Sequence, residues 1–226
     1  MGSTSFVTFR LAGTLPQSVL AAWAAEQEKA KERIRLRGDE LTADEEAPIQ
    51  RLFSDAVEAY LDAGEGDCWL RDARIAGLVA DALKHFDGSR YQLHAWCVMP
   101  NHVHAVFTVP HAVAPPSRRL EGVAPASSRP EQDGRQDGGA TPLAVILHSW
   151  KSFTANQSNR TLGRTGEFWQ REYYDHLIRD EADFRRCVRY TVDNPVKAGL
   201  CRSRKAWQWT GVKDLVAWRR RARASP

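Results

Sequence analysis

The order of apolar and polar residues along the chain predicts strands that alternate with helices. Apolar and polar side chains alternate at 5–11, which is typical of a strand. Residues 17–86 show mostly helical spacing, broken by short glycine-containing loops, and we expect this helical region to be scaffold. Two further strands at 91–99 and 102–109 are joined by the turn Pro100-Asn101. This pair of strands holds the residues with the clearest chemical signal.

The second half of the chain continues the pattern after a polar interruption. Residues 111–141 are rich in Pro, Ala, Ser, Gly and Gln and contain almost no large apolar residues, which predicts a flexible excursion within the domain. A helix from 143 to about 156 and a strand region at 168–178 follow. The chain closes with a basic segment at 202–226, which we expect to be a tail.

Length and composition indicate one globular domain spanning residues 1–226. The 226 residues are 42% hydrophobic and 27% charged, which suits a single good core. No apolar run reaches the roughly 18 residues of a membrane-spanning helix, and the first residues do not resemble a signal segment. We therefore expect a soluble, cytoplasmic protein with no membrane partner. The four cysteines form no CxxC pair, which favours free thiols without a function.

The net charge of +4 conceals an uneven distribution. Residues 1–90 carry 11 Lys and Arg against 16 Asp and Glu, whereas residues 91–226 carry 21 against 12. Clustered positive charge is typical of a surface that binds a polyanion. The second half is therefore the half that we expect to face nucleic acid.

Two histidines stand two residues apart at the start of the strand at 102–109. Because alternate side chains of a strand share a face, His102 and His104 should lie on one face and the apolar residues between and after them on the other. Imidazole is a competent ligand for manganese, zinc and related ions, whereas magnesium prefers oxygen, and a third ligand must come from elsewhere. The same spacing also fits two histidines that bond only to water.

The residues around this pair resemble a known motif. Val98–His104, with the sequence VMPNHVH, resembles the histidine-hydrophobe-histidine motif of the HUH endonucleases in the form used by single-tyrosine transposases. Downstream, the segments FWQREYY at 168–174 and RYTVDNPVKAGL at 189–200 resemble the REP-associated tyrosine transposases. The likeness covers most of the chain apart from 111–141.

This resemblance has consequences for fold and activity. It implies an α+β fold with an antiparallel sheet and flanking helices, a ferredoxin-like or RRM-like HUH endonuclease core. The histidine pair should lie on a central strand, and the nucleophile on a helix beside it. The implied activity is metal-dependent cleavage and rejoining of single-stranded DNA at hairpin-forming repeats, through a 5′-phosphotyrosine intermediate. The implied protein works in the cytoplasm in association with the nucleoid, as a monomer or homodimer.

The nucleophile and a third metal ligand are expected on the last helix. This helix should begin at Asp180, a good N-cap, and end at Asn194, because Pro195 should stop it. Tyr190 and Asn194 are four residues apart, so both side chains project the same way. The resemblance assigns Tyr190 as the nucleophile and Asn194 as a ligand, beside His102 and His104, of a divalent ion, Mg²⁺ or Mn²⁺.

Other interpretations of these residues remain open at this stage. Tyr190 could instead be a half-buried helix residue, and Asn194 could merely end the helix before a proline. Tyr173 and Tyr174 are rival nucleophiles, but strand periodicity puts them on opposite faces and neither has a partner four residues later. We therefore expect them to be substrate contacts.

Basic residues and a tryptophan in the matched segments are candidates for contacts with single-stranded or hairpin DNA. Several phosphates could be contacted by cations, and unpaired bases could stack on an indole ring. A tryptophan is more often part of a core, and the arginines near the C-terminus could equally form a solvated tail. The predicted DNA-binding residues are Lys151, Arg160, Arg164, Trp169, Arg185, Arg186, Arg189 and Lys197.

Two functions from other classes compete with the transposase hypothesis. One is a domesticated protein that binds hairpin DNA and no longer cuts it, because an intact motif does not guarantee turnover. The other is a metal hydrolase in which the histidine pair activates water and Tyr190 is a bystander. A transposase should cleave DNA and form a protein-linked product, and a metal hydrolase should cleave DNA without one. A domesticated protein should bind DNA and not cleave it.

Overall fold

The fold is taken from a computed structural model of the chain. The structure describes residues 2–15, 59–64, 66–110 and 142–213, with scattered helical positions at 18–32 and at 57. Half of the predicted helical region at 17–86, the excursion at 111–141 and the arginine cluster near the C-terminus lie outside the described residues. No described helix is long and apolar enough to cross a bilayer.

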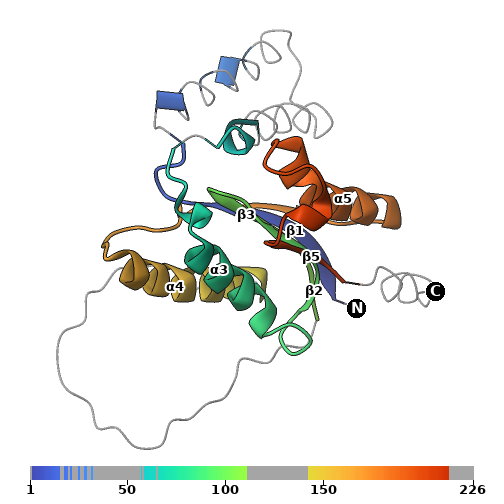
Figure 1. The fold of residues 1–226 in the computed structure, drawn as a ribbon. Helices are drawn as coiled ribbons and strands as arrows, with labels where there is room; N and C mark the ends of the chain where they lie inside the picture. The colour runs from blue at the N-terminus through green and yellow to red at the C-terminus, as the bar shows by residue number, and fades with distance from the viewer. Residues whose placement is uncertain are drawn as a thin grey trace, which may run out of the picture.

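A five-stranded antiparallel sheet forms the centre of the fold (Figure 1). Its order is β4-β1-β3-β2-β5, and every neighbouring pair is antiparallel. The strands are β1 (Ser3–Arg10), β2 (Gln92–Val98), β3 (His102–Val109), β4 (Tyr174–Leu177) and β5 (Thr210–Val212). The predicted strand pair is confirmed, and the strand with the two histidines has a neighbour on each side.

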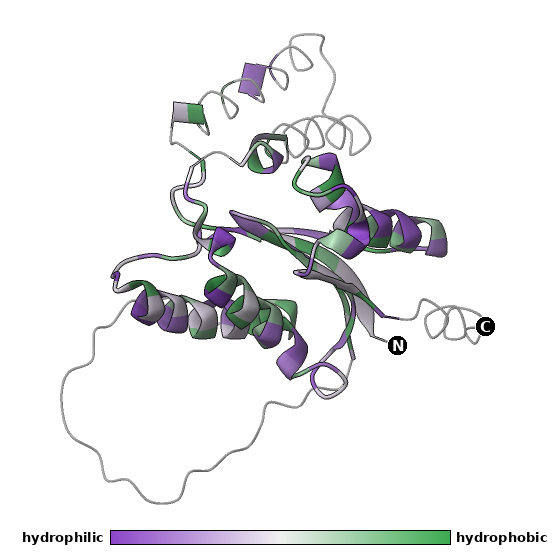
Figure 2. Ribbon diagram, viewed as in Figure 1, coloured by the Kyte–Doolittle hydropathy of each residue, from purple (hydrophilic) through white to green (hydrophobic). Residues whose placement is uncertain are grey.

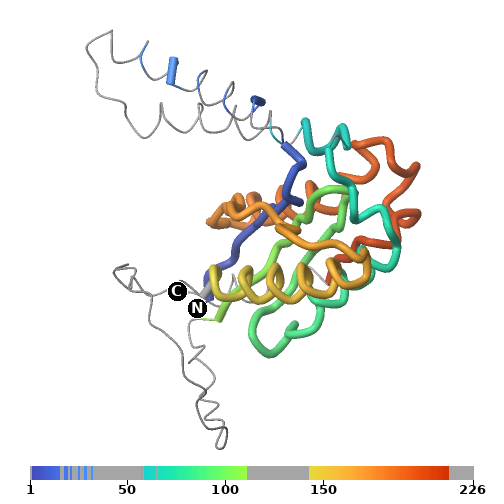
Figure 3. Tube along the Cα trace, turned by 90° about the vertical axis from the view of Figure 1, so that its left-hand side faces the viewer, coloured from blue at the N-terminus to red at the C-terminus, as the bar shows by residue number. Residues whose placement is uncertain are grey.

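Helices cover both faces of this sheet. In Figure 1, α3 (Ala73–His85) and α4 (Pro142–Leu162) lie below the strands, and α5 (Glu181–Lys197) lies above them. The turned view of Figure 3 again has α4, in yellow, and α5, in orange to red, on opposite sides of the strands. Two short 3-10 helices, Trp69–Arg71 and Arg204–Ala206, complete the described elements.

The connectivity is that of a ferredoxin-like core. The order β1-α3-β2-β3-α4-β4 is a β-α-β-β-α-β unit, and its four strands take the spatial order β4-β1-β3-β2. Helix α5 is added on the other face and β5 on the outer edge of β2. The predicted α+β fold with flanking helices is therefore confirmed.

The sheet separates two apolar clusters. The larger one joins Val103, Ala105 and Phe107 of β3 to residues of α3 and α4. The smaller one joins Val106 to the inner face of α5. Figure 2 shows hydrophobic strands between helices whose outer faces are largely hydrophilic. Because side chains alternate along β3, His102 and His104 share the α5 face with Val106.

Three predicted boundaries differ from the structure. Helix α4 runs to Leu162, not to about 156, because buried Ser158 and partly buried Leu162 keep its inner face packed. Gly163, with φ of 62°, then ends it. The predicted tail is shorter than expected, because residues 204–206 form a 3-10 helix and residues 210–212 form strand β5.

The prediction that Pro195 stops the last helix is wrong. Helix α5 continues through this proline to Lys197. A proline in the last turn forfeits one backbone hydrogen bond, the one that its own missing N–H would donate. The next bonds still form, because the Ala198 amide donates to the Asn194 carbonyl and the Leu200 amide to the Pro195 carbonyl. Asn194 therefore lies inside the helix, one turn beyond Tyr190.

The Tyr91 hydroxyl links α3 to α4 within the core. It accepts a hydrogen bond from Trp150 Nε1 at 2.9 Å and donates one to the Leu83 carbonyl at 2.8 Å. Tyr91→Phe leaves both buried partners unsatisfied, so we expect the free energy of unfolding to fall by about 1–3 kcal/mol in urea titrations. Tyr173→Phe, at a half-buried position, is the control and should change it by less than about 0.5 kcal/mol.

Candidate metal and nucleophile site

His102 and His104 lie at the centre of the candidate site. Both are fully buried at the start of β3, on the sheet face that α5 covers. Their Nε2 atoms are 2.9 Å apart, and their ring planes are inclined by 76°. The prediction that the two imidazoles are neighbours on one face is confirmed, and the face is dry.

The other ring nitrogen of each histidine is held by a side chain. Asn101 Nδ2 donates to the Leu61 carbonyl, so its Oδ1 is left to accept from His102 Nδ1 at 2.7 Å. His102 Nε2 therefore carries a lone pair. His104 Nδ1 lies 2.8 Å from the Thr8 hydroxyl, which can accept its proton in the same way. Such partners fix the ring orientation and the tautomer of a metal-binding histidine.

Burial keeps both imidazoles neutral. It lowers the pKa of His102 to about 3, and it lowers the pKa of His104 well below the ordinary value, with a smaller contribution from His102. Two facing Nε2 lone pairs at 2.9 Å repel each other unless a proton or a cation lies between them. Neutral imidazole is also the form that binds metal ions.

The donor set fits a divalent ion. Two nitrogens at ~2.1 Å from one ion and at a right angle to each other are ~3.0 Å apart, close to the observed 2.9 Å. Asn194 is fully buried on α5, and its Nδ2 lies 3.2 Å from His104 Nε2. Its Oδ1 is buried without a hydrogen-bond partner in the structure. An amide oxygen is a suitable hard ligand, so the Asn194 amide is the candidate third ligand from α5.

Tyr190 lies beside the histidine pair. Its ring centroid is 5.2 Å from that of His104 and 5.8 Å from that of Phe6, with edge-on packing against both. It is half-buried at the margin of the smaller apolar cluster, and Lys197 Nζ lies 4.8 Å from its ring centroid. The helix and the strand therefore bring together the tyrosine, the amide and the two imidazoles that the sequence singled out.

One acidic residue near the pair was missed by sequence reasoning. Asp62 lies at the end of the described helical residues 59–62, and its Oδ1 is 3.8 Å from His102 Nε2. Ligand atoms of Asp62, His102 and His104 all lie within 4.8 Å of one another. Burial raises the pKa of Asp62 to about 6, against a lowering by the Asn194 hydrogen bond and Lys197. Asp62 lies 40 residues before His102, in a region predicted to be scaffold, so nothing in the sequence linked the two residues.

A basic groove runs along the outer side of α5 next to Tyr190. Its volume is about 820 Å³. Arg185 and Arg186 also pair with acidic residues one turn earlier, Glu181 and Asp183, whereas Arg189 and Lys197 are exposed. The groove is lined by Glu181, Ala182, Arg185, Arg186, Arg189, Tyr190, Asp193 and Lys197. All four basic residues that were predicted on this helix therefore share a surface with the tyrosine.

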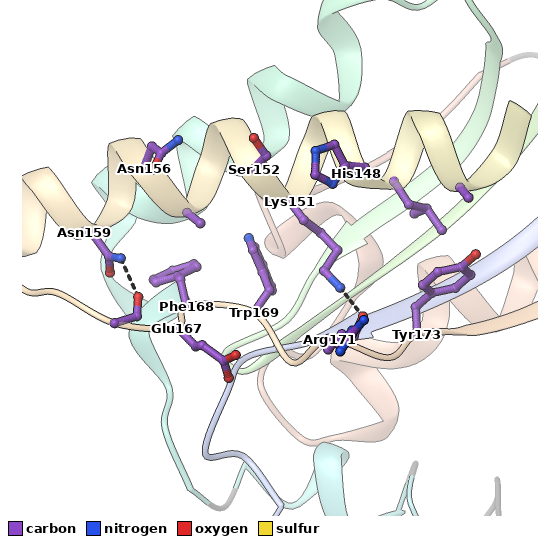
Figure 4. Close-up of a pocket in the computed structure, with 14 residues that line it drawn as sticks. His148, Lys151, Ser152, Asn156, Asn159, Glu167, Phe168, Trp169, Arg171 and Tyr173 are labelled. Atoms are coloured by element: carbon purple, nitrogen blue, oxygen red, sulfur yellow. Dashed lines mark hydrogen bonds between the residues drawn. The ribbon is translucent and has the colours of Figure 1, made fainter. Parts of the chain in front are cut away.

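The other predicted DNA-binding residues lie on or next to α4, across the sheet from Tyr190. Figure 4 shows Lys151 reaching from α4 to the chain at Arg171, and its ammonium donates to the carbonyls of Gln170 and Arg171 at 2.7 Å. Trp169 is 5% exposed and donates to Thr154, so its ring belongs to the core and offers no face to a base.

The two arginines of this set are also separated from the tyrosine. The Arg164 guanidinium lies over the ring of Trp69 at 5.0 Å, and Arg160 is exposed in the last turn of α4. The predicted DNA-binding residues therefore fall into two groups, because the sheet separates α4 from α5.

Tyr173 and Tyr174 point to opposite faces, as their spacing predicted. Tyr173 lines a cavity of about 610 Å³ beside α4, which is shown in Figure 4. Tyr174 is 42% exposed on the α5 side, and its ring centroid is 6.2 Å from that of Phe6. Tyr174 is therefore the rival tyrosine that shares a face with the histidine pair.

Acid should destabilise the metal-free protein. Below about pH 6.5 the unfolded chain protonates both His102 and His104, whereas their lowered pKa values keep the native forms neutral. Asp62 acts in the opposite sense, because its pKa of about 6 lets the native state take up one proton that the unfolded chain takes only near 3.8. About one excess proton in the unfolded state remains, which costs about 1.4 kcal/mol per pH unit near pH 5.

This pH dependence can be measured by urea unfolding in a chelator between pH 7 and 5. Replacing both residues, His102→Gln with His104→Gln, should remove the fall in stability with acid, whatever the variant's stability at pH 7. The exposed His85 on α3 provides the control substitution, His85→Gln, which should retain the fall. An unchanged slope in the double variant would show that the two imidazoles do not titrate in this way.

Comparisons with known proteins agree with the sequence motifs. No protein-family model matches the chain. A REP-associated tyrosine transposase of Escherichia coli (strain K12) is 27% identical over 127 residues, which are 56% of this chain and 58% of that protein. A Haemophilus influenzae protein that provisionally carries the same name is 26% identical over 133 residues, 56% of this chain and 62% of its own length. The chain thus matches about three fifths of each relative.

A solved structure is also similar. It is a REP-associated tyrosine transposase bound to a REP hairpin, with 17% identity and a TM-score of 0.43 over 92% of this chain and 76% of that one. The resemblance to REP-associated tyrosine transposases that the motifs predicted is confirmed by the curated relatives that carry this name.

Proposed function

We propose that this chain is a metal-dependent single-strand DNA endonuclease and strand transferase that acts at hairpin-forming repeats. The observation that carries the proposal is the position of Tyr190, whose ring is 5.2 Å from that of His104 at a buried pair of facing imidazoles. The named relatives support the substrate class, because they carry the name REP-associated tyrosine transposase.

The proposed reaction exchanges one phosphoester for another. Tyr190 Oη attacks the phosphorus atom and loses its phenolic proton, and a bond forms between Oη and phosphorus. The bond from phosphorus to the 3′-oxygen breaks, and this oxygen takes up a proton to leave as a 3′-hydroxyl. The products are a 5′-phosphotyrosine and a free 3′ end. Because one ester replaces another, the reverse attack by a 3′-hydroxyl rejoins DNA without ATP.

Three side chains would hold the ion in this proposal. His102 and His104 offer Nε2, and Asn194 offers a buried amide oxygen that lacks a hydrogen-bond partner. A divalent ion such as Mn²⁺ or Mg²⁺, when bound there, supplies positive charge to the non-bridging phosphate oxygens. The protein itself keeps the imidazoles neutral, excludes water from them and holds the phenol beside them.

The DNA backbone is proposed to follow the basic groove of α5. Arg185, Arg186, Arg189 and Lys197 line this groove together with Tyr190. Cations beside a nucleophile neutralise phosphates and hold the strand in register. Lys151, Arg160 and Arg164, on or next to α4, are not part of this proposed path, and Trp169 is a core residue.

The nucleophile can be tested with paired tyrosine variants. A labelled single-stranded hairpin oligonucleotide is incubated with Mn²⁺, and covalent adducts are separated on a denaturing gel. Tyr190→Phe removes the attacking oxygen, so the adduct should disappear while hairpin binding stays within about threefold of wild type. Tyr174→Phe removes the hydroxyl of the rival tyrosine on the same sheet face, and the adduct should persist.

Two outcomes of this experiment would contradict the proposal. An adduct that survives in Tyr190→Phe would place the nucleophile elsewhere. Metal-dependent cleavage with no protein-linked product in the wild type would mean that water attacks the phosphate.

The DNA path can be tested by the salt dependence of hairpin binding. Arg189→Ala combined with Lys197→Ala removes two exposed cations next to Tyr190, so the slope of log affinity against log salt should become shallower by roughly 1–2. The control is Arg160→Ala with Arg164→Ala, which removes the same charge beyond the sheet. An equal effect of both pairs would contradict a path along α5.

A further inference from the structure

We infer that Asp62 is an additional protein ligand of the proposed ion, so that the site holds its metal with two imidazoles, an amide and a carboxylate. Only the role of the ion in DNA cleavage rests on the proposed function. The role of Asp62 in binding can be measured without DNA.

The contacts of Asp62 leave one carboxylate oxygen unused. Its Oδ1 is buried and has no hydrogen-bond partner in the structure. This atom lies 3.8 Å from His102 Nε2, which is too far for a hydrogen bond. A buried carboxylate oxygen without a donor is costly, and a bound cation would satisfy it.

A second cluster of possible ligands in the described part of the chain provides a comparison. His176, Asp183 and Cys187 also lie within 4.8 Å of one another. There, however, Asp183 is satisfied: Oδ1 accepts from Arg186 at 2.5 Å, and Oδ2 accepts from His176 at 2.8 Å. An aspartate whose oxygens are both bonded to protein donors is an ion-pair partner. Asp62 Oδ1, in contrast, faces lone pairs.

The side-chain amide of Asn194 carries the second buried oxygen that has no hydrogen-bond partner. Asn194 hydrogen bonds to the Asp62 carboxylate and lies 3.2 Å from His104 Nε2, yet its own Oδ1 has no partner and is fully buried. Two Nε2 atoms, the unpartnered Asp62 oxygen and the Asn194 amide group therefore come together from β3, from residues 59–62 and from α5. Four donors gathered from three parts of the chain are a built site.

The local fold holds Asp62 in place through the residue before it. Leu61 is 1% exposed, and its carbonyl accepts a hydrogen bond from Asn101 Nδ2 at 3.1 Å. The same Asn101 side chain orients the His102 ring through Oδ1. One amide thus sets the relative position of the imidazole and of the chain segment that carries the carboxylate.

The chemistry of the carboxylate explains why it is needed. Imidazole and amide ligands are neutral, and hard ions such as Mn²⁺ and Mg²⁺ bind best to anionic oxygen. Sets of two histidines and one carboxylate are established in metalloenzymes. The expected occupant is an ion that accepts both nitrogen and oxygen, which favours Mn²⁺ over Mg²⁺.

The test is calorimetric titration of the full chain with Mn²⁺ and with Zn²⁺ in the absence of DNA. Asp62→Asn keeps the shape and removes the charge, so Mn²⁺ affinity should fall at least tenfold, and by more than Zn²⁺ affinity, because the lost ligand is the hard one. Asp81→Asn removes an exposed carboxylate on α3 and should leave both affinities within twofold. Asp62→Glu keeps a carboxylate and should bind Mn²⁺ more tightly than Asp62→Asn.

The outcomes separate this inference from the proposed function. Unchanged Mn²⁺ affinity in Asp62→Asn, or equal losses for the two metals, would overturn the inference even if the Tyr190 adduct forms. Selective loss of Mn²⁺ affinity supports it even if the wild type yields no adduct, which would count against the proposed reaction alone. Circular dichroism and thermal melting in a chelator establish that the variants are folded.

Discussion

The two-residue period of β3 is the constraint on which the rest of the structure depends. It places Val103, Ala105 and Phe107 in the core under α3 and α4, and it turns His102 and His104 to the face that α5 covers. A one-residue slip would bury the imidazoles among apolar side chains and remove them from Tyr190. Pairing with β1 and β2 on both sides holds the register, so the positions of the two imidazoles are set by the middle of the sheet.

Much of this arrangement could be predicted from the sequence because it depends on local periodicity. The strand pair at 92–109 and the four-residue spacing of Tyr190 and Asn194 each set which side chains share a face. Features that depend on tertiary packing were missed. Helix α4 continues past 156 because its inner face is buried, and α5 runs through Pro195 because the loss of a single bond is tolerated in a last turn.

The same limit applies to the site. Asp62 approaches His102 only through folding of a distant segment, so no spacing in the sequence could reveal it. The sequence placed the basic residues on or next to α4 and those on α5 in one set of candidates, because it cannot tell which helix covers which sheet face. Once the faces are known, the hydrogen bonds of Asn101 and Thr8 explain how the imidazoles are oriented, and the groove of α5 explains how charge is placed beside the phenol.

The most direct measurement of the central claim is mass spectrometry of the protein after reaction with a hairpin oligonucleotide and Mn²⁺, followed by nuclease and trypsin. Trypsin cuts after Arg189 and Lys197, so the nucleophile falls in the peptide 190–197, while Tyr173 and Tyr174 fall in 172–179. The account predicts a nucleotide linked through its 5′-phosphate to Tyr190. A nucleotide on the peptide 172–179, or cleaved DNA with both peptides unmodified, would contradict it.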